Sequence, residues 1–260
     1  MKLAHDDGGS GPVVVLLHGF PLSRAMWQHQ RKAIESTHRL ITPDLRGHGE
    51  SPAPEGVYTM DEMADDVVEL LDQLKIEQPI VLGGLSMGGY VALSLVCRHP
   101  GRVRGLMLID SRAAADTPEA ARLREATARA VLQANHAGSI IETMVPRLFG
   151  KTTLEQHPER VGPILAVMEK TSAQGVAGAL RGMAVRPDRR ADLASINIPT
   201  LVMVGQDDVI STVAEAREIA GALPNARLEV IPAAGHLAPY ENPPAANDVM
   251  LGFLNHLGKG

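Results

Sequence analysis

The chain has 260 residues, which is long for one average domain and fits a single core that carries an inserted cap. Hydrophobic residues make up 45% of the chain and charged residues 21%, and this composition excludes a disordered or fibrous protein. The formal net charge of −5 provides no basic footprint for phosphate backbones, so nucleic acid is not expected as a partner.

The N-terminal residues carry no apolar stretch of the kind a signal peptide needs, and no apolar run is long enough to span a bilayer. Cys97 is the only cysteine, so no disulfide can form within the chain. We therefore expect a cytoplasmic protein with no membrane partner, present as a monomer or homodimer.

Short apolar runs bounded by glycine and proline alternate with longer segments of helical spacing, which is typical of βαβ units on a parallel sheet. Apolar residues at helical spacing over 60–74, with Thr59 and Glu62 placed as a capping box, predict an amphipathic helix. Buried strands are predicted at 13–17, 40–42, 80–82, 106–109, 201–204 and 228–231.

Strand signals disappear between about residue 111 and residue 190, where stretches rich in Ala, Arg and Glu take over. A strand restarts at Ile198-Pro199-Thr200. We therefore predict a core domain made of residues 1–110 and 191–260, with a helical cap inserted at residues 111–190.

The predicted strand at 80–82 continues through Gly84-Leu85-Ser86-Met87-Gly88 into a predicted helix. A sharp turn in this context holds the serine in strained backbone angles with its Oγ exposed. The two glycines are needed because a Cβ at either position would collide with neighbouring backbone. We predict that Ser86 is a catalytic nucleophile.

A serine nucleophile needs a general base within hydrogen-bond reach and a third group that orients the base. Two histidines lie beyond the last strands, and His236 directly follows a strand whereas His256 lies near the C-terminus, so we predict His236 as the base.

Three aspartates are candidates for the orienting acid. Asp208 and Asp207 follow the strand at 201–204, from which a side chain can reach back toward His236. Asp110 follows the strand at 106–109, and its alternative role is to cap the departure of the chain into the cap region. We prefer Asp208 to Asp207, and either of them to Asp110.

Acyl chemistry also needs donors aimed at the developing oxyanion. The backbone N–H of Met87, which follows the nucleophile, is one expected donor, and the N–H of Phe20, in the loop after the first buried strand, is the other. With only one Trp, three Tyr and three Phe in the chain, any pocket is mostly aliphatic. The residues predicted at the substrate, for which core packing is the alternative role, are Trp27, Met144, Leu148, Met168 and Leu237.

Neither a His-x-His-x-Asp-His cluster nor a His-Glu-x-x-His motif occurs, so we expect no metal. The glycines at 83–89 have the wrong spacing for dinucleotide phosphates, and no phosphate-binding Gly-x-x-x-x-Gly-Lys loop occurs. We expect hydrolysis without a cofactor, acting on a small-molecule substrate.

Several separated segments now occur in one order: His18-Gly19-Phe20, the DLRGHGES stretch at 44–51, the serine turn, and the loops at Gly205 and Gly235. In this the chain resembles enzymes of the α/β-hydrolase fold, which use the chain order Ser, Asp, His. The resemblance implies a mostly parallel central sheet with flanking helices and an inserted helical cap. The sequence departs from the family at its start: the fold usually opens with two further strands, but only residues 1–6 precede the turn at 8–11, so we expect the first of these strands to be absent.

The resemblance also narrows the chemistry. Relatives that cleave carbon–halogen bonds or epoxides carry Asp where Ser86 stands, and carbon–carbon hydrolases of meta-cleavage products usually carry Asn where Leu85 stands. The pattern is most similar to small carboxylesterases, enzymes like 3-oxoadipate enol-lactonase, and acyl-homoserine lactone hydrolases. It implies cleavage of esters or lactones through an acyl-serine. The alternatives are perhydrolase or haloperoxidase-like activity and a non-catalytic ligand-binding role.

Overall fold

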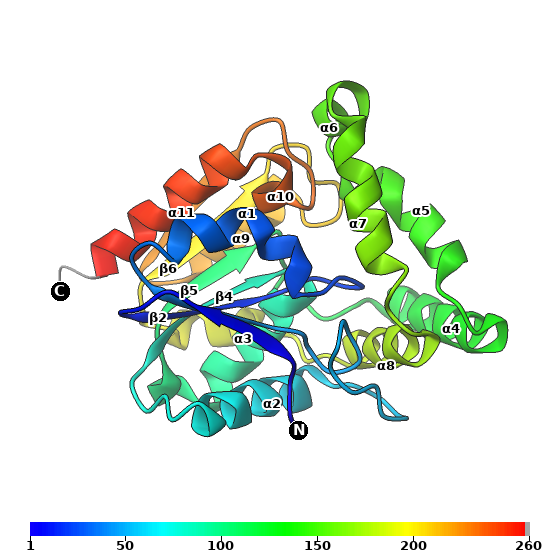
Figure 1. Ribbon diagram of the computed structural model, residues 1–260, viewed down its shortest axis with the longest axis horizontal. Coiled ribbons are helices and arrows are strands. Elements are labelled where there is room, and N and C mark those ends of the chain that lie inside the picture. Colours follow the sequence, from blue (N-terminus) through cyan, green and yellow to red (C-terminus); the bar gives the residue numbers. More distant parts are fainter. Residues whose placement is uncertain (258–260) are drawn as a thin grey trace.

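The sheet is built from the apolar, β-branched runs of the sequence, which lie at its centre with their side chains buried on both faces. The computed structural model describes residues 1–257, and it has one seven-stranded sheet in the order β1-β3-β2-β4-β5-β6-β7 (Figure 1). The strands are β1 (His5–Gly8), β2 (Val13–Leu17), β3 (Arg39–Pro43), β4 (Ile80–Leu85), β5 (Val103–Ile109), β6 (Thr200–Gly205) and β7 (Ala226–Ile231).

All six predicted strands are present, and the sheet has one further strand at its edge, β1, which pairs antiparallel with β3 and places His5 opposite Pro43. The other neighbouring pairs are parallel. The sequence of β1, His-Asp-Asp-Gly, has no apolar alternation, because an edge strand needs no buried face. Within the described residues, one strand precedes β2 in the sheet.

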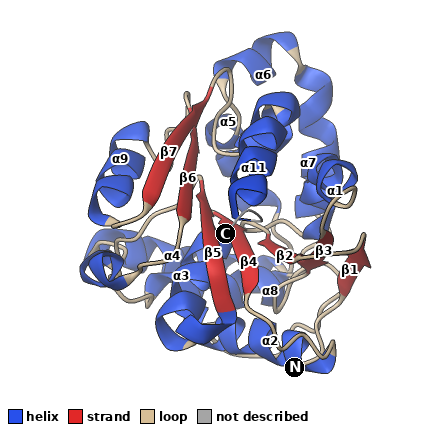
Figure 2. Cartoon of the chain, turned by 90° about the vertical axis from the view of Figure 1, so that its left-hand side faces the viewer, coloured by secondary structure: helices blue, strands red, loops and turns tan. Residues whose placement is uncertain are grey.

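Helices cover both faces of the twisted sheet: α1 and α11 lie on one face, and α2 and α3 lie on the other (Figures 1 and 2). The predicted helix at 60–74 is α2, and its capping box is formed, because Thr59 Oγ1 accepts from the Glu62 N–H at 3.1 Å. The helices of the core are η1 (Arg24–Trp27), α1 (Gln28–Ile34), α2 (Met60–Gln73), α3 (Met87–Arg98), η2 (Pro100–Arg102), η4 (Arg190–Ser195), α9 (Val213–Ala222), α10 (Ala238–Glu241) and α11 (Pro243–Leu257).

Between β5 and β6 the chain leaves the sheet and forms a set of helices on one side of it (Figure 1). These are α4 (Pro118–Ala134), α5 (Gly138–Leu148), α6 (Lys151–Gln156), η3 (Pro158–Arg160), α7 (Val161–Met168) and α8 (Ala173–Ala184). Helices α4 and α8 pack side by side, while α5 and α7 stand farther along the molecule. Within residues 1–257, no helix is both long enough and apolar enough to cross a membrane.

The two chain segments that lead into and out of these cap helices, residues 113–116 and 186–189, contact each other and are called the neck below. The Arg189 N–H donates to the Ala113 carbonyl at 2.8 Å. Arg186 forms an ion pair with Asp116 at 2.7 Å, and both side chains are only 4% exposed. A buried pair of this kind is favourable only when its remaining hydrogen bonds are also formed, and Arg186 Nε donates to the Ala114 carbonyl at 3.1 Å.

Candidate active site

The turn between β4 and α3 places Ser86 at the carboxyl end of the sheet. Ser86 has φ 52° and ψ −112°, and a positive φ is unusual for a residue with a side chain. A Cβ on Gly84 would lie 2.2 Å from the Gly88 carbonyl oxygen, and a Cβ on Gly88 would lie 2.4 Å from the Leu17 carbonyl oxygen. The two glycines are therefore required by the close approach of backbone that the sequence predicted.

Ser86, His236 and Asp208 lie in one chain of hydrogen bonds. His236 Nε2 is 2.8 Å from Ser86 Oγ, and His236 Nδ1 is 2.8 Å from Asp208 Oδ2. With Nδ1–H donating to the carboxylate, Nε2 is left to accept the hydroxyl proton of the serine. His236 is buried while Ser86 is partly exposed, so the serine is open to solvent and the base is not.

The three candidate acids occupy different positions. Asp208 is the one that contacts His236, and its other oxygen accepts the N–H groups of Ile210 and Ser211 at 2.7 and 2.9 Å. These two bonds hold the carboxylate in place against the ring. Asp207 is a neighbour in sequence only: its N–H donates to the Ala234 carbonyl at 2.8 Å, and within the described residues its side chain makes no hydrogen bond to His236.

Asp110 is fully buried beside these residues, but its carboxylate contacts backbone and not the imidazole. It accepts the Gly205 N–H at 2.8 Å and the Ala238 N–H at 3.0 Å, so it joins the ends of β5 and β6 to the start of α10. The alternative role expected for it, capping the departure of the chain toward the cap helices, is not what these bonds show. Burial raises the pKa of the Asp110 carboxyl well above its ordinary value, and the nearby Asp208 charge raises it further.

The two expected oxyanion donors are the amides that directly follow Gly19 and Ser86 in the chain. Gly19 is packed so closely against the elbow that a Cβ on it would lie 3.5 Å from Ser86 Cβ, which brings the Phe20 amide to the same place. Within residues 1–257, the amides of Phe20 and Met87 have no backbone acceptor. Both N–H groups are therefore free to bind an oxygen atom.

The loop that carries Phe20 is supported by a pair of buried histidines. The Leu45 N–H donates to His18 Nε2 at 2.9 Å, so the proton of His18 is on Nδ1, which bonds the Gly19 carbonyl at 2.9 Å. The ring of His48 lies 5.1 Å from that of His18, centroid to centroid. Burial lowers the pKa of His18 to about 4 and that of His48 to about 3, and the neighbouring His18 also lowers the pKa of His48. Both rings are neutral at pH 7.

The five residues predicted at the substrate differ in exposure. Trp27, Leu148, Met168 and Leu237 are at most 1% exposed, whereas Met144 on α5 is only half-buried. Leu148 lies beside the base, since its carbonyl accepts the His236 N–H at 2.9 Å. Of the five, Met144 is thus the one with an appreciably exposed side chain in this structure.

Glu241 was not recognised from the sequence, although it is buried and lies close to the base. It stands five positions after His236 and is 1% exposed. Its Oε1 accepts the Gly235 N–H at 2.8 Å. A charged residue so close to a predicted catalytic histidine, just before a Pro-Pro helix start, is the signal that could have indicated it.

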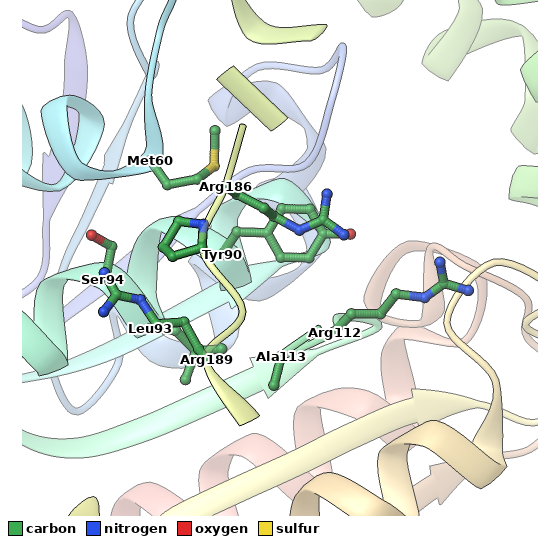
Figure 3. Close-up of a pocket in the computed structure, with 9 residues that line it drawn as sticks. Met60, Tyr90, Leu93, Ser94, Arg112, Ala113, Arg186 and Arg189 are labelled. Atoms are coloured by element: carbon green, nitrogen blue, oxygen red, sulfur yellow. The ribbon is translucent and has the colours of Figure 1, made fainter. Parts of the chain in front are cut away.

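A hollow lies behind the nucleophile helix, next to the neck of the cap (Figure 3). The Arg186 guanidinium lies over the Tyr90 ring, 4.3 Å from its centroid, and Tyr90 is one helical turn beyond Ser86. The volume of the hollow is about 10 Å³, roughly the space that one water molecule needs. It is too small for a substrate.

No group of three or more His, Cys, Asp or Glu side chains is placed to hold a metal ion in the described part of the chain.

Comparison with known proteins finds relatives and solved structures that match most of the chain. A family model described as the alpha/beta hydrolase fold matches residues 12–243. The structure of an esterase from Thermogutta terrifontis with malate bound is 44% identical, covers 98% of this chain and 93% of that one, and has a TM-score of 0.96. The enol-lactonase from Burkholderia xenovorans LB400 is 30% identical over 97% and 96% of the two chains, with a TM-score of 0.90. The curated 3-oxoadipate enol-lactonase 1 of Acinetobacter baylyi is 31% identical and covers 95% of this chain and 90% of its own length.

Proposed function

The chain belongs to the alpha/beta hydrolase fold family, and from this we propose that it is a serine hydrolase that cleaves carboxylic esters or lactones through an acyl-serine intermediate. The family and the relatives support a hydrolase role. The observation that carries the finer proposal is the hydrogen-bond chain from Ser86 through His236 to Asp208, with 2.8 Å at each step.

In the proposed acylation step, Ser86 Oγ attacks the carbonyl carbon while His236 Nε2 takes the hydroxyl proton. Asp208 accepts the Nδ1–H bond, holds the ring in the required tautomer and stabilises the imidazolium that forms. The free N–H groups of Phe20 and Met87 receive the negative charge of the tetrahedral intermediate. The intermediate collapses as His236 returns the proton to the leaving alcohol.

In the proposed deacylation step, His236 removes a proton from water, and the resulting hydroxide attacks the acyl-serine. The acid is released and the proton returns to Ser86 Oγ. In a lactone the alcohol remains tethered to the acyl group, so acylation opens the ring without loss of a fragment. The same residues therefore serve esters and lactones, and the cap decides which of them fits.

The acyl group is proposed to lie under the cap against the predicted apolar side chains of Trp27, Met144, Leu148, Met168 and Leu237. Methionine adapts to varied apolar shapes, which suits a pocket for flexible chains. The relatives include an esterase and enol-lactonases, which supports both substrate classes.

The proposal is tested with p-nitrophenyl esters of increasing acyl length, together with enol-, aliphatic and homoserine lactones. Ser86→Ala should lower kcat by roughly 10⁴-fold or more, because attack and acyl transfer both need Oγ. Mass spectrometry after a fluorophosphonate should show Ser86 modified in the wild type only. A Ser86→Ala variant with wild-type turnover would contradict the proposal, and an unlabelled, inactive wild type would favour a ligand-binding role instead.

A further inference from the structure

The loop that carries His236, residues 235–238 and hereafter the base loop, has every backbone N–H held by an acceptor outside it. In chain order, Gly235 N–H donates to Glu241 Oε1 at 2.8 Å, His236 N–H to the Leu148 carbonyl at 2.9 Å, Leu237 N–H to Glu241 Oε1 at 3.2 Å, and Ala238 N–H to Asp110 Oδ2 at 3.0 Å. The position of the His236 ring is therefore set by these acceptors, and Glu241 supplies two of the four bonds.

The other oxygen of the same carboxylate binds the cap. Glu241 Oε2 accepts the Gly150 N–H at 2.7 Å and the Thr153 hydroxyl at 2.7 Å, at the N-terminal end of α6. The contact is close enough that a Cβ on Gly150 would lie 2.8 Å from the Gly235 nitrogen. The Glu241 carboxylate thus lies between the cap and the base loop and binds both.

A carboxylate in this position links its two sets of partners mechanically. Its two oxygens are fixed in one plane, and the ionised form can only accept hydrogen bonds, two or more of them at each oxygen. If the cap moves away, Oε2 loses both donors while the side chain is still buried, and an unsatisfied buried charge is costly. The side chain then has to turn toward new donors, and its hydrogen bonds to the base loop break.

We propose that Glu241 is a positioning residue that couples the seating of the cap to the placement of His236, so that the base reaches Ser86 only while Gly150 and Thr153 are docked on the Glu241 carboxylate. The catalytic consequence rests on the proposed function, because it requires His236 to act as the base. The mechanical coupling between cap and base loop does not.

Two substitutions separate this coupling from a merely structural role. Thr153→Val keeps the shape of the side chain and removes one cap-side bond. Within residues 1–257 the Thr153 hydroxyl bonds Glu241 and is not hydrogen-bonded to Ser86, His236 or Asp208. Glu241→Gln also keeps the shape, but its amide group donates, so it cannot satisfy all four donors. The matched control is Asp66→Asn, which alters a buried carboxylate on α2 that accepts a hydrogen bond from Arg46 Nε at 2.8 Å.

Amide hydrogen exchange of the peptide that contains residues 235–238 is measured by mass spectrometry, and kcat and KM are measured with p-nitrophenyl acetate at a temperature where circular dichroism shows each variant folded. Thr153→Val and Glu241→Gln should each raise exchange in the base loop by about tenfold or more, since one or two bonds to a charged group are lost. Both should lower kcat by about tenfold with KM changed by less than about twofold. Asp66→Asn should change neither readout.

Unchanged base-loop exchange and unchanged kcat in Thr153→Val would overturn the coupling, and so would a kcat loss in both variants that only follows the fraction unfolded. A wild type that cleaves no ester or lactone would overturn the proposed function alone, because the exchange measurement still reports whether the cap holds the base loop.

Discussion

The serine elbow (residues 84–88) and the base loop (residues 235–238) meet at the same site but are held in different ways. The elbow is shaped mostly by its own glycines and by the strand and helix directly on either side of it, with β2 approaching Gly88 through the Leu17 carbonyl. The base loop is held by Asp110, Leu148 and Glu241, of which the first two are far away in the sequence. A short motif thus specifies the nucleophile, whereas the base depends on the whole tertiary structure.

The largest effect expected on the base side comes from the acid. Asp208→Asn should lower kcat by about 10³ to 10⁴-fold, because an amide at this position favours the wrong imidazole tautomer. Asp207→Asn is the matched control, next in sequence, and should stay within about threefold of wild type. Steady-state kinetics with p-nitrophenyl acetate measures both.

Asp110→Asn tests the support of the base loop at a residue that does not contact the imidazole ring. Asn keeps only one of the two acceptor oxygens that bind the Gly205 and Ala238 N–H groups, so one bond is lost and kcat should fall by about tenfold. A larger loss of kcat in Asp110→Asn than in Asp208→Asn would show that the acid is assigned to the wrong residue.

On the elbow side, Gly84→Ala should lower kcat by about 10²-fold or more, because the new Cβ would meet the Gly88 carbonyl oxygen at 2.2 Å and the turn must shift. Thermal unfolding should report a lower Tm as well. Gly101→Ala is the control, since a Cβ at Gly101 meets nothing within 4 Å. If Gly84→Ala and Gly101→Ala behave alike, the elbow does not depend on local backbone contacts.

The smallest effect concerns His18 and His48, which support the loop that carries Phe20. It is seen in how the free energy of unfolding depends on pH. Because the pKa values of His18 and His48 are about 4 and about 3 in the folded state, against 6.5 ordinarily, the unfolded state binds more protons below pH 6.5. Their contribution to stability is complete above pH 6.5 and is lost as the pH falls toward 4 for His18 and 3 for His48. Between pH 6.5 and pH 5 the free energy of unfolding should fall by roughly 2 kcal/mol for each histidine.

Urea unfolding at pH 7, 6 and 5 measures this slope. His48→Asn, which can still donate to the Arg46 carbonyl, should make the slope shallower, and His136→Asn at an exposed position should leave it as in the wild type. A wild-type free energy of unfolding that is flat from pH 7 to pH 5 would show that these two rings are not held neutral by burial.

Much of the architecture could be predicted from the sequence. The six apolar strands, the α2 helix with its Thr59 cap, and the change to helices after β5 all follow from periodicity and from turn residues, which act between near neighbours. The edge strand β1 was missed because its four residues pair through the backbone and bury no apolar face. Backbone pairing leaves no pattern in the side chains.

In the candidate site, too, some features follow from residues close in sequence and others from long-range packing. The sequence by itself determined that a serine stands in a strained turn at the end of a parallel strand, because Gly84 and Gly88 leave room that no other residue would leave. Only the tertiary structure decided which aspartate faces His236 and that Glu241 joins the base loop to the cap. Three carboxylates converge at the carboxyl edge of the sheet, and hydrogen-bond distances of 2.7 to 3.0 Å, set by long-range packing, assign each one its partners.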